Sequence, residues 1–312
     1  MTVLVLGGYG AVGQHLIGEL RGAGTTALAA GRDPDRADVR VDLAEAELGS
    51  LRRAAAAAEV VVNASGSEDP RVATAVAAAG AAFVDISATS DYLAELERLT
   101  PAAPVLIGVG LAPGLTNLLA AAVHAAAPGP VDIGVMLGAG EKHGAAATAW
   151  SYGLLGRTFR DGAGTVRNYT APLTFDLPGH GRRRMYRTDF ADQHALTRDL
   201  GVPVRTYFAL DSRLATAALS TATWIPGARH MPRTVPMPGT DEWIALARGG
   251  SGELRWARGW NQSAATAALT AVAVRAVTAL GVGVHQQHSV QTVHDVTGLP
   301  GIEFGSCSAE VA

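Results

Sequence analysis

Short runs of β-branched residues alternate with alanine-rich stretches along the first 130 residues. Six apolar runs have the length and composition of buried strands, and the segments between them have helical spacing of apolar positions. Strands that recur in this way with helices between them indicate a parallel, doubly wound sheet. The predicted strands are Val3–Leu6, Thr26–Ala30, Val39–Leu43, Val60–Asn63, Ala82–Ile86 and Pro104–Val109, and the predicted helices are Ala11–Arg21, Glu45–Ala58, Arg71–Ala79 and Ser90–Leu99.

The pattern changes after residue 130. Asp132–Leu137 and the alternating run Val204–Leu210 have the composition of strands. Hairpin turns are expected at Asp161-Gly162 and at Gly179–Gly181. These features predict a mixed or antiparallel sheet in the middle of the chain.

The last part of the chain is similar in composition to the first. Ser263–Leu280 has the pattern of a long helix of alanine and valine that ends at Gly281. We therefore predict an α/β chain of two domains. A Rossmann-type, doubly wound parallel sheet takes residues 1–128 plus 262–312, and an inserted α+β substrate domain takes residues 129–261.

Composition excludes several classes of protein. The chain has 312 residues, of which 48% are hydrophobic and 17% charged, and a composition of this kind is not that of a disordered protein. A net charge of −3 argues against a nucleic-acid partner. The single cysteine, Cys307, allows no internal disulfide and no cysteine-based zinc site. The most apolar stretch, Leu118–Ala127, is too short to span a membrane, and no basic segment precedes the apolar run at Val3, so we expect a cytoplasmic protein.

Charge is unevenly distributed along the chain. Residues 1–130 carry 8 arginines and 14 acidic residues, whereas residues 131–261 carry 15 arginines and one lysine against 11 acidic residues. A basic middle segment predicts a small-molecule substrate with an anionic group. The alternative is that these arginines form a solvated surface.

A glycine-rich turn follows the first predicted strand and leads into an apolar helix. It contains both Gly-x-Gly-x-x-Gly and Gly-x-x-Gly-x-x-Gly. Glycine permits a tight turn and lets backbone N–H groups approach a pyrophosphate, to which the start of the helix adds a partial positive charge. We therefore expect a dinucleotide to bind here. The residues of the turn are Gly7, Gly8, Tyr9, Gly10, Ala11, Val12 and Gly13.

The end of the second strand indicates which dinucleotide binds. A site for NAD places Asp or Glu there to bind the ribose 2′-hydroxyl, whereas this chain has Gly31 followed by Arg32. An arginine can bind the 2′-phosphate of NADP(H). Asp33 precedes Pro34 and is interpreted as a helix N-cap. The prediction is therefore NADP(H).

Further cofactor contacts are expected where the next two strands end, because ligands bind at the carboxyl ends of parallel strands. Asp42 and Leu43 end the third strand and are placed to border the adenine, although capping of the next helix explains Asp42 equally well. Asn63, Ala64 and Ser65 end the fourth strand.

Several oxidoreductase chemistries are excluded by missing residues. Short-chain dehydrogenases use Tyr with Lys four residues later, but the only lysine is Lys142, and position 138 is Gly. The cysteines of zinc-dependent alcohol dehydrogenases and a Gly-x-Ser-x-Gly nucleophile motif are also absent. Hydride transfer itself needs only a bound nicotinamide, an electrophile held against it and at most one proton donor.

Lys142 and His143 are the candidate proton donors. Lysine, unlike arginine, can exchange a proton, and histidine titrates near neutrality. Tyr152 is a further candidate acid for a carbonyl substrate, and Trp150 and Arg157 are candidate pocket residues at near-helical spacing. A surface position for the lysine and core packing of the tryptophan are the alternatives.

Two other clusters have simple structural interpretations. Arg182–Arg184 and Arg187 could bind carboxylates, but strand neighbours point to alternate faces, so we expect one or two to act and the rest to be solvated. His285, His288 and His294 have no acidic residues at metal-ligand spacing, so no metal site is expected.

Five motifs together resemble those of a known family. They are GGYGAVG at 7–13, AGR at 30–32, VVNASG at 61–66, AGAAFVDIS at 79–87 and GLAPGLTN at 110–117. These motifs are similar to those of the saccharopine dehydrogenase/reductase-like NADP-binding proteins. The resemblance is specific over residues 1–120, looser in the middle segment and weak in the last helix.

The resemblance implies a fold, a chemistry and an assembly. It implies a Rossmann domain with an inserted domain that closes over the nicotinamide, dimerisation through that inserted domain, and NADP(H)-linked chemistry at a carbon–nitrogen bond. It carries over the glycine turn, Arg32, Asn63–Ser65 and Ser87 as cofactor-binding residues, but no catalytic residue. Because the chain is shorter than family members that act on saccharopine, glutamate and aminoadipate substrates are not carried over.

Three functions follow as hypotheses. The first is an NADPH-dependent reductase of an imine on a small amine or amino-acid-derived substrate in biosynthesis, with Lys142 or His143 as proton donor. The second is reduction of a C=C or C=O bond in a lipid or polyketide, which would need Tyr152 or Lys142 as a stronger acid. The third is a non-catalytic NADP(H)-sensing protein.

Overall fold

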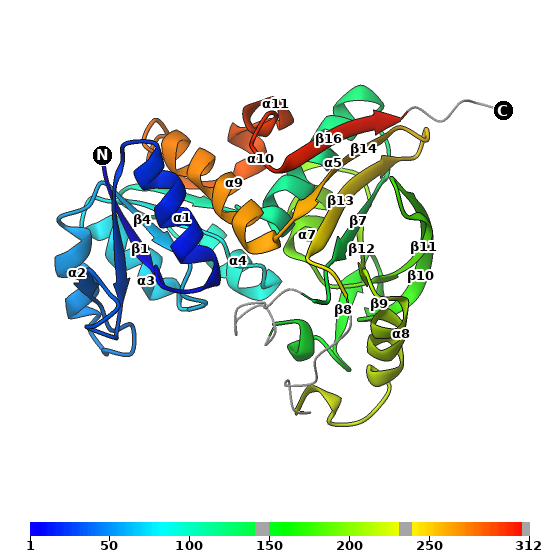
Figure 1. Ribbon diagram of the computed structural model, residues 1–312, viewed down its shortest axis with the longest axis horizontal. Helices are drawn as coiled ribbons and strands as arrows, with labels where there is room; N and C mark the ends of the chain where they lie inside the picture. The colour runs from blue at the N-terminus through cyan, green and yellow to red at the C-terminus, as the bar shows by residue number, and fades with distance from the viewer. Residues whose placement is uncertain (141–149, 231–238, 308–312) are drawn as a thin grey trace. The chain divides into compact units, whose positions relative to one another are not determined.

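The chain folds into two units, each built on a seven-stranded sheet. The computed structural model describes residues 1–140, 150–230 and 239–307. Unit 1 is Met1–Leu115 with Ser263–Val296, and unit 2 is Thr116–Gln262 with Thr297–Ala312. Figure 1 shows both units and labels their elements.

The unit borders differ from the predicted domain borders at two places. Helix α5 (Thr116–Ala126) packs on strands β7, β13 and β14, which belong to unit 2. Strand β16 (Ile302–Cys307) pairs with β14 (Leu254–Trp260) in the same unit. Both segments therefore belong to unit 2 and not to the predicted nucleotide domain. The cofactor role predicted for one domain and the substrate role predicted for the other stay predictions.

Unit 1 contains the predicted doubly wound sheet. Its strand order is β15-β6-β5-β4-β1-β2-β3, and every neighbouring pair is parallel. The order reverses between β1 and β4, which is the switch point at which such sheets bind ligands. The strands are β1 (Thr2–Leu6), β2 (Thr26–Gly31), β3 (Val39–Arg40), β4 (Val60–Asn63), β5 (Ala82–Asp85), β6 (Pro104–Ile107) and β15 (Gly283–Gln286).

Helices cover both faces of this sheet, which explains why its strands are apolar on both sides. Valines of β1, β4 and β5 pack against buried side chains of α1 and α9 in one core, and α2, α3 and α4 lie on the opposite face (Figure 1). The helices are α1 (Ala11–Gly22), α2 (Gly49–Ala55), α3 (Pro70–Ala78), α4 (Ser90–Glu97), α9 (Gln262–Val277), α10 (Gln287–Val290) and α11 (Val293–Val296).

The structure corrects three details of the predicted sheet. The helix predicted for Glu45–Ala58 is only α2, because Leu48 takes a left-handed conformation (φ 49°) that a helix cannot continue through. The third strand is two residues long rather than Val39–Leu43. The seventh strand, β15, was not predicted, because Gly283–Gln286 is short and polar.

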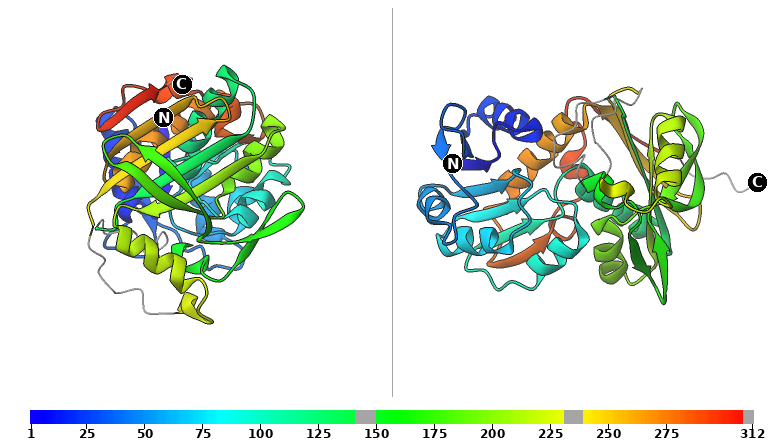
Figure 2. Two further views of the ribbon diagram at one scale, coloured as in Figure 1. Left: turned by 90° about the vertical axis from the view of Figure 1, so that its right-hand side faces the viewer. Right: turned by 90° about the horizontal axis from the view of Figure 1, so that it is seen from below.

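Unit 2 is built on a mixed sheet of order β10-β11-β12-β7-β13-β14-β16. Only β12 and β7 pair in parallel, and all other neighbours are antiparallel. The left view of Figure 2 shows these strands from one face. The remaining strands are β7 (Val131–Leu137), β10 (Thr170–Leu177), β11 (Gly181–Arg187), β12 (Val204–Leu210) and β13 (Glu242–Gly249).

Both predicted hairpins are present in unit 2. Asp161 pairs with Gly164 where β8 (Thr158–Asp161) turns into β9 (Gly164–Arg167), and Leu177 pairs with Gly181 between β10 and β11. Helices α5 and α7 (Ala191–Leu200) contact each other and the sheet, and α8 (Arg213–Ala222) contacts β12. The protein is therefore of the predicted α/β class, with a Rossmann-type sheet and a second, mixed sheet.

Candidate dinucleotide site

The glycine turn between β1 and α1 is held by its own backbone. The N–H of Gly7 donates to the carbonyl of Ala30 at 2.9 Å, and that of Gly10 donates to the carbonyl of Gly7 at 2.8 Å. Gly7 has φ +72°, and a Cβ there would lie 2.6 Å from the carbonyl oxygen of Ala64. A Cβ on Gly13 would collide with the carbonyl of Gly7. These glycines are therefore required by close backbone approach.

The start of α1 is open to an anion. Gly10 is its N-cap, with extended backbone and no side chain that caps the helix, and the first turn (Ala11, Val12 and Gly13) contains no acidic residue. The N–H groups and partial positive charge of a helix start attract phosphate. The turn and the uncapped helix start fit the pyrophosphate of a dinucleotide.

Tyr9 fills the space at the end of β2. A Cβ on Gly31 would lie 2.5 Å from the Tyr9 hydroxyl oxygen, so a larger residue at position 31 would require the Tyr9 side chain to move. The guanidinium of Arg36 lies 4.4 Å from the centre of the Tyr9 ring and donates to the Tyr9 carbonyl at 3.0 Å. The last residue of β2 is therefore a glycine beside the Tyr9 ring, at a place where an NAD site typically has an acidic residue.

Arg32 is exposed directly after β2, and two nearby carboxylates, those of Asp33 and Asp38, accept hydrogen bonds from other groups. Asp33 accepts from the N–H of Asp35 at 3.0 Å and forms a turn, so the predicted helix start at Asp33 is wrong. The Asp38 carboxylate accepts from Arg21 at 2.9 Å and from the N–H of Ala29. Arg32 and Arg36 thus flank the end of β2 with positive charge.

Asp42 forms a local turn rather than the cap of a helix. Its carboxylate accepts from the N–H of Ala44 at 3.0 Å, and its own N–H donates to the hydroxyl of Ser50 at 3.0 Å. Leu43 beside it is half-buried. Because the next helix starts only at Gly49, the cap interpretation of Asp42 is wrong, and its place beside the adenine stays a prediction.

The predicted residues at the end of β4 form a tight turn. The side-chain oxygen of Asn63 accepts from the hydroxyl of Ser65 at 2.7 Å and from its N–H at 3.3 Å, and the Asn63 amide donates to the carbonyl of Ser67 at 2.9 Å. Ala64 donates its N–H to the carbonyl of Leu6 at 3.0 Å. The turn is thus fixed beside the glycine turn, with Ser65 exposed.

A buried carboxylate lies at the end of β5. Asp85 accepts from the Asn63 amide at 2.8 Å, the Tyr92 hydroxyl at 2.9 Å and the N–H of Ser87 at 2.7 Å. Burial raises the pKa of Asp85, and the hydrogen bonds from Ser87, Asn63 and Tyr92 oppose that rise. Ser87, a predicted cofactor residue, is therefore joined to Asn63 through Asp85.

The predicted catalytic and substrate residues belong to the other unit. Lys142 and His143 lie outside the described residues. Trp150 packs edge-on against Phe190 with ring centres 4.8 Å apart, which accounts for it by core packing. Tyr152 is half-buried near the end of a helix, and Arg157 is exposed beyond that helix. The catalytic roles stay predictions.

The arginines of the basic segment are largely engaged within unit 2. Arg187 is 4% exposed and pairs with Asp161 at 2.6 Å, Arg248 pairs with Asp132 at 3.0 Å, and buried Arg183 donates to the carbonyl of Asp211. Arg182 and Arg184 are exposed, as the alternation of strand side chains predicts. The positive charge of this segment is therefore not all available to a substrate.

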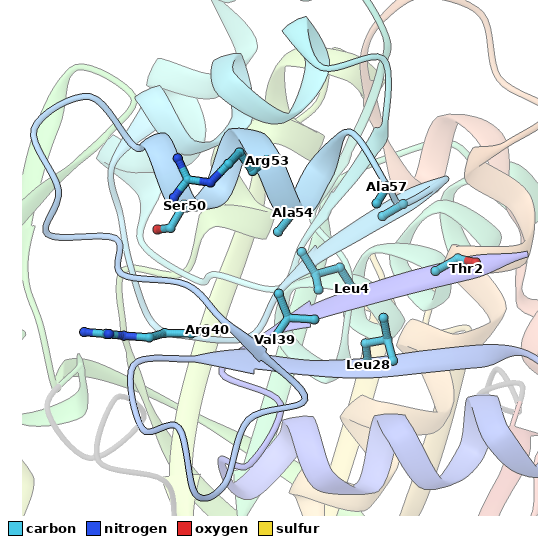
Figure 3. A pocket seen from close by; sticks show the side chains of 10 residues that line it. Thr2, Leu4, Leu28, Val39, Arg40, Ser50, Arg53, Ala54 and Ala57 are labelled. Carbon is cyan, nitrogen blue, oxygen red and sulfur yellow. The ribbon is translucent and has the colours of Figure 1, made fainter.

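A cavity of about 320 Å³ lies between α2 and strands β1 to β3 (Figure 3). Leu4, Leu28 and Val39 come from the strands, Ala54 comes from α2, and Ala57 comes from the turn that follows this helix. No residue of the glycine turn lines the cavity, so it is not the phosphate site.

Sequence reasoning missed the side chains that organise the site. Arg36 could have been found as a second arginine four residues after Arg32. Asp85 could have been found as the acidic residue that ends an otherwise apolar strand. Nothing in the sequence indicates that Tyr9 lies on Gly31 or that Tyr92 reaches Asp85.

Within the described residues, no helix combines the length and hydropathy needed to cross a membrane. In the same part of the chain, no group of three His, Cys, Asp or Glu side chains is placed to bind a metal ion.

Comparisons with known proteins assign no family to the chain. No protein-family model matches it, and neither does any curated protein. A solved structure from Lactobacillus casei is 24% identical with a TM-score of 0.21, and the match covers 36% of this chain and 50% of that one. The chain thus spans about half the length of that structure.

Longer matches are more distant in sequence. Aspartate semialdehyde dehydrogenase II from Vibrio cholerae is 10% identical with a TM-score of 0.38 over 81% of this chain and 73% of that chain. An isoflavone reductase is 15% identical with a TM-score of 0.27 over 75% of this chain and 91% of that chain. At these TM-scores the likeness supports no statement about function, and the fold assignment rests on the strand order of unit 1.

Proposed function

We propose that the protein is an NADP(H)-dependent oxidoreductase. The observation that carries this proposal is the glycine turn at Gly7–Gly13, which leads into a helix start that no side chain caps. Close backbone approach and an open helix start are what a pyrophosphate requires. The turn lies at the point where the strand order reverses, which is the expected ligand site of this fold.

The choice of NADP(H) rests on the end of β2. β2 ends in Gly31 beside the Tyr9 ring, with no carboxylate there; Arg32 follows it directly, and the Arg36 guanidinium lies over the same Tyr9 ring. An arginine binds a phosphate through charge-assisted hydrogen bonds. Arg36 is already oriented by its contacts with Tyr9. Arg32 is exposed directly after β2, and its proposed role is to bind the 2′-phosphate.

The proposed reaction is reduction of a C=N bond on a small amine or amino-acid-derived substrate. It is supported by the resemblance to saccharopine dehydrogenase/reductase-like proteins. When bound, the nicotinamide supplies a hydride. Reduction of an imine adds this hydride to the carbon and one proton to the nitrogen. Because an imine nitrogen is readily protonated, the chain needs to provide only a mild proton donor, for which Lys142 and His143 are the candidates.

The cofactor proposal is tested by exchanging one arginine. Arg32→Ala should weaken NADPH binding by about tenfold, because a charge-assisted contact with the 2′-phosphate is lost, and should leave NADH binding nearly unchanged. Arg98→Ala is the matched control, since Arg98 is exposed at the far end of α4. An equal loss for both cofactors would overturn the role of Arg32.

The reaction is tested by NADPH consumption with a panel of substrates. The panel contains cyclic imines and amine-plus-keto-acid pairs, with ketones and enoyl thioesters beside them. Turnover with C=N substrates alone is expected, and Lys142→Met should then lower kcat with cofactor binding intact. Turnover only with ketones or enoyl thioesters would contradict C=N reduction and favour reduction of a C=O or C=C bond. Tight NADPH binding with no turnover would favour a non-catalytic sensor.

A further inference from the structure

One fully buried carboxylate joins three segments at the ligand end of unit 1. Asp85 is 0% exposed, and its oxygens accept from a side chain at the end of β4, from the backbone after β5 and from a side chain of α4. The side chains are Asn63 and Tyr92, and Tyr92 is only 3% exposed. The carboxylate therefore has no exposed surface of its own with which to touch a ligand.

Asn63 connects Asp85 to the turn that packs against Gly7. The same amide group that donates to Asp85 also donates to the carbonyl of Ser67, and the amide oxygen accepts from Ser65. The turn made by these residues lies directly against Gly7, where a Cβ would come within 2.6 Å of the Ser65 Cα. A shift of Asn63 would therefore move the backbone of residues 64 and 65, which packs directly against Gly7.

We propose that Asp85 and Tyr92 are positioning residues for the dinucleotide, which act through Asn63 to hold the Ser65 turn and Gly7 in the geometry that receives it. This inference rests on the proposed function. It assigns the cofactor contacts to Ser65, Ser87 and the glycine turn, and assigns to the buried pair the task of fixing their positions before the cofactor binds. Preorganisation of this kind lowers the cost of ordering these groups on binding.

The chemistry of the partners explains why a carboxylate is needed at position 85. An amide N–H, a phenol O–H and a backbone N–H all donate to it, and a carboxylate offers two acceptor oxygens with no competing donor. An asparagine there would direct its own NH₂ group at one of these donors. Burial also raises the pKa of the Tyr92 hydroxyl, which keeps it a donor at neutral pH.

The test compares two network variants with one core variant. Tyr92→Phe removes one hydrogen bond and should weaken NADPH binding about threefold to tenfold, while Asp85→Asn leaves a buried donor unpaired and should weaken it by roughly tenfold or more. Val76→Ala is the control, because Val76 is 0% exposed in α3 and its truncation lowers stability without removing a hydrogen bond of the network. Binding is followed by NADPH fluorescence.

A second measurement does not depend on the cofactor. Hydrogen exchange of the amides of residues 64–67 in the free protein should be faster in Tyr92→Phe and in Asp85→Asn than in the wild type, and unchanged in Val76→Ala. If Asp85→Asn fails to fold, Tyr92→Phe decides both measurements.

The outcomes separate this inference from the proposed function. A wild-type protein that binds no NADPH overturns the proposed function and this role with it. A wild-type protein that binds NADPH, with Tyr92→Phe indistinguishable from it in affinity and exchange, overturns the positioning role alone. Equal losses of affinity in Tyr92→Phe and Val76→Ala would also overturn it, because general stability would then set the affinity.

Discussion

The sheets of the two units place their buried polar side chains differently. In strands β1, β4 and β5 of unit 1 the interiors are apolar, and the buried polar side chains, Asn63 and Asp85, are the last residues of β4 and β5. The other buried polar side chains of this unit lie in or next to its helices and not in its sheet: Ser263, Thr270, Gln287 and Gln291. In unit 2 buried polar groups lie within the packed elements, where Arg187 of β11 bonds to Asp161 of β8 and Gln193 of α7. In a parallel sheet that helices cover on both faces, polar side chains are accommodated mainly at the ends of the strands. A mixed sheet has no such restriction.

This difference changes what a charged residue in the sequence indicates. A polar residue that ends a buried parallel strand is a good candidate for a ligand site, because few other positions are open to it. An arginine in the mixed sheet is as often part of the unit's own structure, as Arg183, Arg187 and Arg248 are. The basic middle segment is therefore weak evidence for an anionic substrate.

Tryptophan fluorescence separates the two units in experiments. The chain has five tryptophans, at positions 150, 224, 243, 256 and 260, and all lie in the sequence of unit 2. Their emission therefore reports on unit 2, while NADPH titration reports on the proposed cofactor site in unit 1.

The largest expected effect is loss of the buried ion pair in unit 2. Arg187→Ala leaves Asp161 without its closest cation and should reduce the free energy of unfolding of unit 2 by about 3 kcal/mol. Urea unfolding followed by tryptophan fluorescence measures this change. Arg160→Ala, at an exposed position on β8, is the control and should change it by less than about 0.5 kcal/mol.

The NADPH affinity of Arg187→Ala tests the same comparison between the units. If Arg187 serves only the structure of unit 2, the variant should bind NADPH like the wild type at temperatures where unit 2 is folded. A loss of affinity as large as that caused by Arg32→Ala would contradict the division of roles.

A side chain added to the glycine turn should lower the free energy of unfolding less than Arg187→Ala does, but should strongly weaken NADPH binding. Gly13→Ala forces a Cβ against the carbonyl of Gly7 and should reduce the free energy of unfolding by about 2 kcal/mol while abolishing measurable NADPH binding. Far-UV dichroism and NADPH fluorescence measure the two effects.

Gly18→Ala is the matched change on the same helix. A Cβ on Gly18 meets nothing within 4 Å, so this variant should gain about 0.5–1 kcal/mol of stability and keep its NADPH affinity. Normal NADPH binding by Gly13→Ala would show that the turn is not the pyrophosphate site.

The smallest expected effect is a pH dependence that arises in unit 2. Burial alone would raise the pKa of Asp211, but N–H groups of Thr240, Ala139 and Ser212 and the Thr240 hydroxyl hold it below its ordinary value. This carboxylate therefore contributes stability that is fully present above the unfolded-state pKa of about 4 and is lost as the pH falls through the lower folded-state pKa.

Asp211→Asn should remove this contribution. The decline in unit 2 stability below about pH 4 should be shallower in the variant than in the wild type when tryptophan fluorescence is followed in urea. Identical slopes would mean that these hydrogen bonds do not favour the charged form. Asp85 in unit 1 shifts in the opposite direction, so its own contribution decreases as the pH rises above about 4.

Local patterns predicted much of unit 1. The apolar runs located the first six strands, although the third is shorter than predicted, and the glycines marked the turn. In a parallel sheet both signals are local in sequence. The prediction failed where tertiary context decides. Leu48 in a left-handed conformation shortens α2, and β15 is short and polar, so it has no strand pattern of its own.

The candidate site was predicted only in part, for a physical reason. Gly7–Gly13 and Arg32 follow strands directly and Asn63 ends one, so their location follows from the strand pattern. Arg36 and Tyr92 reach the site from a loop and from α4 by contacts across the fold, with Tyr9 and with Asp85 respectively. Spacing along the chain cannot show contacts of that kind.

The most direct test of the central claim is calorimetric titration of the wild-type protein with NADPH and with NADH at one ionic strength. NADPH should bind with an affinity at least about tenfold higher than NADH, since only NADPH carries the phosphate that we propose Arg32 and Arg36 to bind. Equal affinities would contradict the assignment of the 2′-phosphate, and no binding of either would contradict the assignment of unit 1 as a dinucleotide-binding unit.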